Sequence, residues 1–75
     1  MIKSRRERFE DVAGKRVQNI IDKLELLGNC ANRNNYEYNS EDVKKMFAAI
    51  RETLKRTEGK FDDELIKQEK KRFQF

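Results

Sequence analysis

The residues with the clearest chemistry in this chain are two clusters of cations, one near each end. Residues 3–8 carry four cations against one acid, and residues 67–72 carry the same balance. Guanidinium and ammonium groups gathered in this way attract polyanions, and each phosphate contact releases a condensed counterion. The candidate nucleic-acid-binding residues are Lys3, Arg5, Arg6, Arg8, Lys67, Lys70, Lys71 and Arg72.

These clusters also have an explanation that needs no ligand. Cations at the C-terminal end of a helix complement its dipole, which accounts for Lys70, Lys71 and Arg72. The arginines near the start of the chain gain no such help, because a helix N-terminus is the positive end. A solvated surface and a site for nucleic acid or an acidic protein surface therefore both remain open. No helix-turn-helix, zinc-finger or RNA-recognition signature decides between them.

A second candidate site lies in the middle of the chain, where five asparagines and two tyrosines fall close together. Asparagine tolerates the left-handed region and hydrogen-bonds its own backbone, so a turn-rich connector is expected. Arg33, Tyr36 and Tyr38 are of the residue types that anchor protein interfaces. Either these side chains point outward and bind a protein, or the tyrosines fold onto the helix ends and close the core.

Residues for catalysis are scarce. The chain contains no histidine, which removes the usual proton shuttle and the commonest metal ligand. One cysteine cannot form an internal disulfide or a thiolate zinc site, and no glycine-rich phosphate loop occurs. We therefore expect no enzymatic activity, no metal, no cofactor and no small-molecule substrate.

Composition indicates one small soluble domain over residues 1–75. Hydrophobic residues make up 36% of the chain and charged residues 43%, so little apolar area is available for a core. No run approaches the length needed to span a bilayer, and the charged N-terminus leads into no signal-peptide core. We expect a cytoplasmic protein without a membrane partner.

The first half of the chain has the apolar spacing of an amphipathic helix. Its stripe consists of Phe9, Ala13, Val17, Ile20, Leu24 and Leu27. These residues recur at intervals of three and four, which is the helical period. The pattern predicts a helix over about 4–27, ended by Gly28 in the left-handed conformation.

The second half repeats this pattern after a candidate cap. Either Asn39 or Ser40 can accept hydrogen bonds from the first turn of a helix. The stripe that follows consists of Val43, Phe47, Ile50, Leu54, Thr57, Phe61 and Leu65. Because it keeps its phase across Gly59, we predict one helix over about 40–72. A break at Gly59, giving a three-helix fold, is the alternative.

These segments predict an all-α fold. A connector over 28–39 between two long helices most simply gives an antiparallel helical hairpin. In that hairpin the two basic clusters converge at the end opposite the connector. Two helices form a thin core, so the stripes are also expected to pair with a second copy in a four-helix homodimer.

Three segments of the chain have a distinctive sequence: the run from Leu27 to Tyr38, residues 42–50, and the ending Lys70-Lys71-Arg72-Phe73. Through them, most of the chain resembles a family of short proteins from conjugative transposons and plasmids of Gram-positive bacteria. The group has no established activity, so it implies no site residues. It implies an accessory factor of a mobile element, and such factors commonly handle DNA, regulate transfer or disable host defence machinery.

Three functions therefore remain as hypotheses. The first is a nucleic-acid-binding protein that uses the converged basic end. The second is a protein-binding regulator or inhibitor of host machinery, such as a defence nuclease, that uses Arg33, Tyr36 and Tyr38. The third is a purely structural homo-oligomer.

Overall fold

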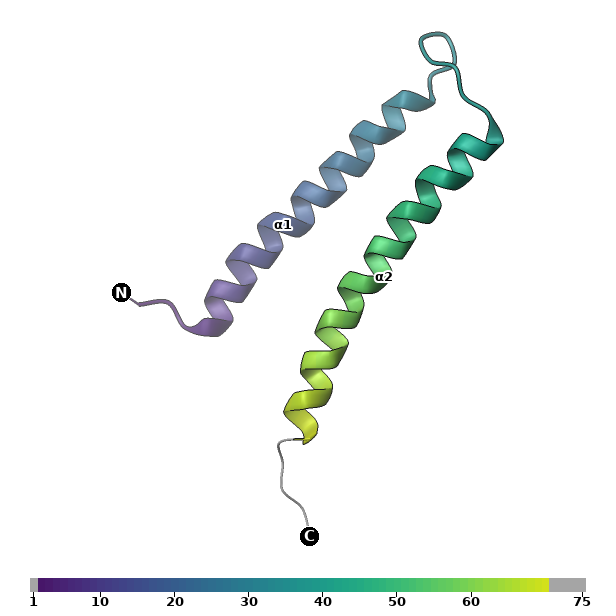
Figure 1. Cartoon of the computed structure of the whole chain (residues 1–75). Helices are drawn as coiled ribbons and strands as arrows, with labels where there is room; N and C mark the ends of the chain where they lie inside the picture. The colour runs from purple at the N-terminus through teal and green to yellow at the C-terminus, as the bar shows by residue number, and fades with distance from the viewer. Residues whose placement is uncertain (1, 71–75) are drawn as a thin grey trace. The chain divides into compact units, whose positions relative to one another are not determined.

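The regular elements of the protein are all helical in the part of the chain that the structure describes. This computed structural model describes residues 2–70. Helix α1 spans Arg5–Gly28, a short 3-10 helix η1 spans Asn29–Ala31, and helix α2 spans Ser40–Lys70 (Figure 1). The predicted all-α class is confirmed, and two long helices joined by a connector are consistent with the predicted hairpin.

The chain divides into two compact units, Met1–Glu37 and Tyr38–Phe75. The first contains α1 and η1, and the second contains α2. The convergence of the basic clusters and the four-helix homodimer stay predictions.

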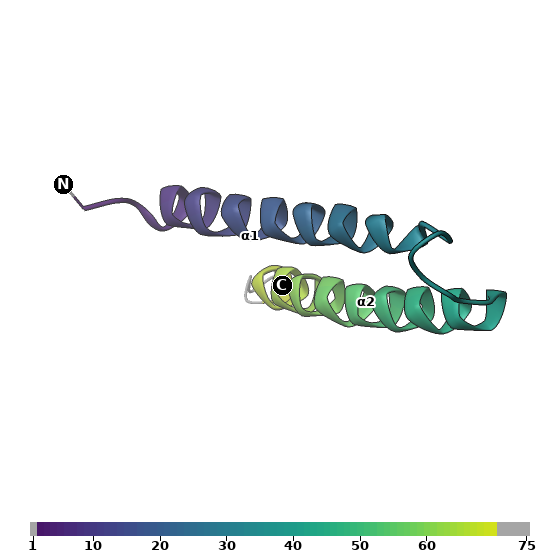
Figure 2. The same ribbon diagram turned by 90° about the horizontal axis from the view of Figure 1, so that it is seen from above.

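Helix α1 begins at a side-chain cap. The backbone N–H of Glu7 donates to Oγ of Ser4 at 3.1 Å, and the Ser4 hydroxyl donates to Oε1 of Glu7 at 3.2 Å. The pair satisfies one of the orphan N–H groups of the first turn and places an acid at the positive end of the helix. From this cap α1 runs without a break to its last turn (Figure 2).

The end of α1 differs from the prediction at Gly28. Gly28 belongs to the helix with right-handed angles, φ −57° and ψ −30°, and no described residue has a positive φ. The N–H of Asn29 donates to the carbonyls of Leu26 and Leu27, and the chain continues into η1. The predicted left-handed stop is wrong because this tighter turn satisfies the last carbonyls of the helix without one.

Helix α2 is capped by Asn39. Ser40 is the first residue of the helix, and Oδ1 of Asn39 accepts the N–H of Asp42 at 2.9 Å. The choice between Asn39 and Ser40 is thereby decided for Asn39. Glu41 and Asp42 lie in the first turn, where the helix dipole favours acids.

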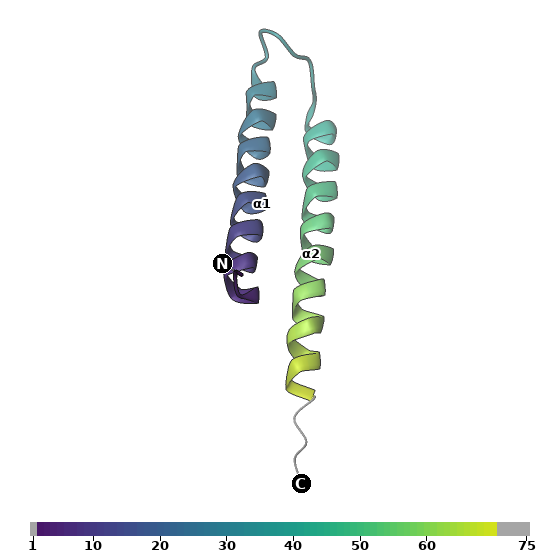
Figure 3. The same cartoon turned by 90° about the vertical axis from the view of Figure 1, so that its left-hand side faces the viewer.

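Gly59 does not interrupt α2, which continues to Lys70 (Figure 3). A glycine in a helix interior costs only about 1 kcal/mol relative to alanine, which is too little to break a long amphipathic helix. The three-helix alternative is therefore wrong for the described residues. The predicted final residues of this helix, 71 and 72, lie outside the described part of the chain.

Both apolar stripes lie at the surface of their helices. No described residue is buried, and only a few stripe residues, such as Leu27 and Ile50, are half-buried. Ile20 on α1 is 60% exposed and Leu54 on α2 is 57% exposed. Neither helix is both long and apolar enough, over its described residues, to cross a bilayer.

Candidate nucleic-acid interface

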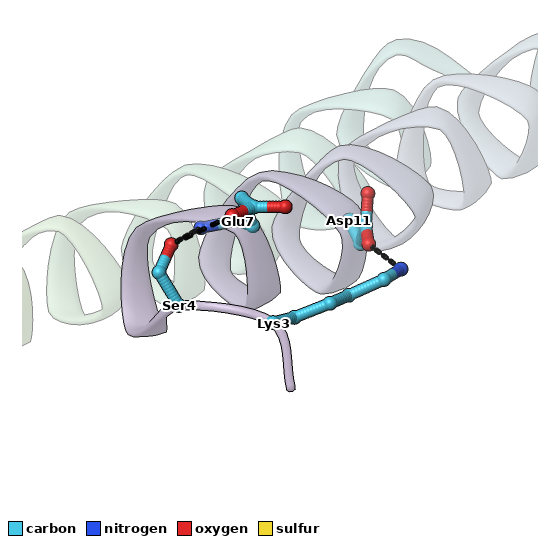
Figure 4. A network of polar contacts seen from close by, with 4 residues as sticks. All are labelled: Lys3, Ser4, Glu7 and Asp11. Carbon is cyan, nitrogen blue, oxygen red and sulfur yellow. Dashed lines mark hydrogen bonds and ion pairs between the residues drawn. The ribbon is translucent and has the colours of Figure 1, made fainter. Parts of the chain in front are cut away.

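The N-terminal basic cluster is partly engaged by acids of its own helix. The Lys3 ammonium reaches along the first turns of α1 and pairs with the Asp11 carboxylate (Figure 4). Nε of Arg6 donates to Oε1 of Glu10 at 2.9 Å, and the same guanidinium lies 5.7 Å from the ring centroid of Phe9. Two of the four cations in residues 3–8 therefore already have an anionic partner.

Arg5 and Arg8 differ from their neighbours. Both are exposed, and within residues 2–70 neither forms an ion pair or a side-chain hydrogen bond. The acid of the cluster, Glu7, is tied to the Ser4 cap rather than to an arginine. These two guanidinium groups are consequently available for a phosphate without breaking a contact.

The C-terminal basic cluster is described only in part. Nζ of Lys67 lies 3.5 Å from Oε1 of Glu64, an exposed pair at i,i+3 that contributes little to stability. Lys70 is the last residue of α2, and Lys71 and Arg72 lie outside the described residues. The two basic clusters belong to different units, so their proximity stays a prediction.

The geometry of α1 adds three cations that the sequence analysis did not single out. At about 100° per residue, Lys15, Arg16 and Lys23 lie on the same side of the helix as Arg5 and Arg8. We call this side the basic flank, and it consists of Arg5, Arg8, Lys15, Arg16 and Lys23. Plotting charges around the helix axis would have found it, whereas counting charges along the chain did not.

A second sector of α1 has acids as its only charged residues, and it adjoins the basic flank where Asp22 lies about 20° around the axis from Lys15. This acidic flank consists of Glu7, Glu10, Asp11, Asp22 and Glu25. The apolar stripe separates the two flanks on one side of the helix. Arg6 is the one cation of α1 that lies within the stripe, and it pairs with Glu10 across the border to the acidic flank.

The connector has a defined local shape. Oδ1 of Asn32 accepts the N–H of Asn34 at 3.0 Å, and its backbone carbonyl accepts the N–H of Tyr36 at 3.0 Å. This Asx turn presents Tyr36 with 53% of its surface exposed. Tyr38 is half-buried and belongs to the second unit, and Arg33 is exposed in the first. Tyr36 is accessible within its own unit, and the closure of a core by the two tyrosines stays a prediction.

The described residues offer no metal centre. No group of three or more Cys, Asp or Glu side chains is arranged to hold a metal ion in that part of the chain. Cys30 is exposed in η1 and takes part in no disulfide. The candidate binding groups of the described residues are the cations of α1 and the side chains of the connector.

Comparisons with known proteins give no relative for this chain. No protein-family model matches it, and neither the curated proteins nor the solved structures contain a match.

Proposed function

We propose that this protein is a small, non-enzymatic accessory factor of a mobile element that binds nucleic acid in the cytoplasm. One observation carries the proposal. The guanidinium groups of Arg5 and Arg8 are exposed and have no anionic partner among the described residues, although acids are frequent on the same helix.

Arginine at these positions suits a phosphate ligand. Its planar fork donates two parallel hydrogen bonds to a phosphate and is more weakly hydrated than an ammonium group. Both arginines lie in the first turns of α1, where the positive end of the helix dipole adds to the local potential. The net charge of +4 further favours encounter with a polyanion.

A fluorescence-anisotropy titration with a DNA duplex of about 20 bp tests the proposal, with the salt concentration varied from about 0.05 to 0.2 M. We expect binding that weakens steeply with salt, because phosphate contacts release counterions. Replacing Arg5→Gln together with Arg8→Gln should weaken binding, and the charge-matched variant Lys44→Gln with Lys55→Gln on α2 should not. Absence of binding at the lowest salt concentration would overturn the proposal.

The predicted convergence of both chain ends gives a separate experimental arm. If the hairpin forms as predicted, neutralising the C-terminal cluster at Lys67, Lys70, Lys71 and Arg72 should weaken binding as much as neutralising the N-terminal one. A silent C-terminal variant would leave the first unit as the binding element and would refute a shared basic end.

A second candidate function is the binding of a host protein, such as a defence nuclease. The exposed Tyr36 on its Asx turn favours it, because tyrosine anchors protein interfaces at low entropic cost. A pull-down from the native host, with and without nuclease treatment, separates the two functions. A partner that resists nuclease and is lost on replacing Tyr36→Ala with Tyr38→Ala would favour protein binding over nucleic-acid binding.

Homodimer formation is a further proposal, supported by the exposure of both apolar stripes. Phe61 and Leu65 on α2 are each more than half exposed, at 56% and 59%. Exposed apolar faces of this length usually mark an interaction surface in a soluble protein. A dimer in sedimentation experiments would support this proposal and is compatible with either binding function.

A further inference from the structure

The charges of α1 are segregated in a way that identifies its binding face. Within a sector of about 100° around the helix, at 3.6 residues per turn, all five charged residues are cations. Within a second sector of about 120°, which adjoins the first at Asp22 and Lys15, all five charged residues are acids. An isolated solvated helix gains from mixing opposite charges at i,i+4, and Arg6–Glu10 is the one such ion pair that α1 forms among its described residues.

The ion pairs of the first unit leave the basic flank open. Both pairs use acids of the acidic flank, Glu10 and Asp11, and cations that lie outside the basic flank, Arg6 and Lys3. Lys15 follows Asp11 by one turn, yet the Asp11 carboxylate is taken by Lys3. All five side chains of the basic flank are exposed, and none has an ion pair or hydrogen bond in the described part of the chain.

We infer that the basic flank, from Arg5 to Lys23, binds the phosphate backbone of a double-stranded nucleic acid along one strand. This inference rests on the proposed function and names the surface and the form of the ligand. The flank is a band about 27 Å long at 1.5 Å per residue, so its cations can contact several consecutive phosphates of one strand.

The acidic flank determines how α1 meets the duplex. A helix inserted into the major groove has phosphates on both sides, because that groove is only about 12 Å wide. The acids Glu25 and Asp22 would then face one of the two backbones and be repelled. Contact from the basic flank alone turns Glu7, Glu10 and Glu25 away from the phosphates and leaves Asp22, which borders Lys15, as the nearest acid. Such contacts fix position without reading bases, so binding is expected to be independent of sequence.

Two other polyanions fit the same surface less well. Proteins that bind single strands stack bases on aromatic side chains, and the basic flank contains no aromatic residue. An anionic membrane would receive the apolar stripe and then contact both flanks, including the acids. The phosphate backbone of a duplex, in contrast, can be bound by the basic flank alone.

The test uses the full chain and replaces cations that lie outside the N-terminal cluster. Arg16→Gln with Lys23→Gln removes two charges from the basic flank, and Lys44→Gln with Lys55→Gln removes two from α2, where acids lie among the cations. Glutamine has a helix propensity close to those of arginine and lysine, so both variants should keep the circular dichroism of the parent chain. Binding of a random DNA duplex of about 20 bp is measured over a range of salt concentrations.

We expect the flank variant to lose about 50-fold in affinity at about 0.1 M salt, since each phosphate contact contributes about 0.9 to the salt slope. Its slope should become shallower by about 1.8, and the α2 variant should change affinity by less than about threefold. If the parent chain binds and the flank variant loses no more than the α2 variant, the assignment to this flank is overturned while the proposed function stands. If the parent chain does not bind any duplex, the assignment to the basic flank and the proposed function are both refuted.

Three further probes decide the form of the ligand. Duplexes of unrelated sequence should bind equally well, and a strong preference for one of them would overturn backbone contact. Tighter binding of a single-stranded oligonucleotide, or of vesicles containing phosphatidylserine, would overturn the duplex as ligand. Weaker binding of the oligonucleotide and of the vesicles than of the duplex would support the duplex as ligand.

Discussion

Asn39 and Asp42 cap each other's backbone at the start of α2. The N–H of Asp42 donates to Oδ1 of Asn39 at 2.9 Å, and the N–H of Asn39 donates to Oδ2 of Asp42 at 3.0 Å. This is a capping box with aspartate in the place of the usual glutamate. It joins the last residue of the connector to the first turn of the longest helix in the described chain.

Loss of this cap should destabilise α2. We expect Asn39→Ala to cost about 1 kcal/mol, because the N–H of Asp42 then loses its side-chain acceptor. The measurement is the thermal unfolding of the helical signal in far-ultraviolet circular dichroism. Ser40→Ala serves as the control, since the Ser40 hydroxyl makes no capping bond in the described structure. Equal losses in the two variants would contradict the assignment of the cap to Asn39.

The end of α1 gives a second prediction. Gly28 has right-handed angles, and a Cβ built on it meets no atom within 4 Å. Gly28→Ala should therefore leave the helical signal unchanged or raise stability by up to about 1 kcal/mol. A left-handed glycine at this point would give the opposite sign, a loss of about 1–2 kcal/mol. Thermal unfolding of the variant distinguishes the two, with Gly59→Ala as a reference for a helix interior.

The helices were predictable from sequence because their apolar residues keep one period over many turns. That signal located α1 to within one residue at each end and carried α2 through Gly59. The conformation of Gly28 was not predictable, because a 3-10 turn and a left-handed glycine end a helix equally well on composition alone. The hydrogen bonds at the end of α1 determine the right-handed conformation of Gly28.

The candidate site was only partly predictable for a related reason. Counting charges along the chain found Arg5 and Arg8 but missed Arg16 and Lys23, which are separated from them by acids in sequence and aligned with them on the helix. The pairing of Lys3 with Asp11 was also missed, since eight residues separate them and Lys3 lies before the helix begins. A helical projection shows the alignment of Arg16 and Lys23 with Arg5 and Arg8. The Lys3–Asp11 ion pair is visible only in the three-dimensional structure.

A third prediction compares two apolar residues of α1 that are nearly equally exposed in the structure. Ile20 is 60% exposed and lies in the apolar stripe, whereas Leu26 is 57% exposed and lies outside it. If the stripe is covered in solution by another helix or a second copy, Ile20→Asp should cost about 2 kcal/mol or more, because it buries a charge. Leu26→Asp should stay within about 0.5 kcal/mol.

Unfolding experiments and sedimentation together check this third prediction. Loss of both stability and self-association in Ile20→Asp alone would show that the stripe is covered in the folded state. Two silent variants would show instead that the stripe of α1 stays open, and the predicted homodimer would then be refuted for this helix.

The ion pair between Lys3 and Asp11 gives the last prediction. Asp11→Asn should release the Lys3 ammonium for a phosphate, while Glu25→Gln removes an equal charge from the same acidic flank without freeing any paired cation. Exposed pairs are worth at most about 1 kcal/mol, so the difference in duplex affinity between the variants should be about two- to fivefold. The salt slope should steepen by about 0.9 in Asp11→Asn and stay unchanged in Glu25→Gln, because only the first gains a phosphate contact. Equal slopes in the two variants would contradict the prediction, because releasing Lys3 from Asp11 would then add no phosphate contact.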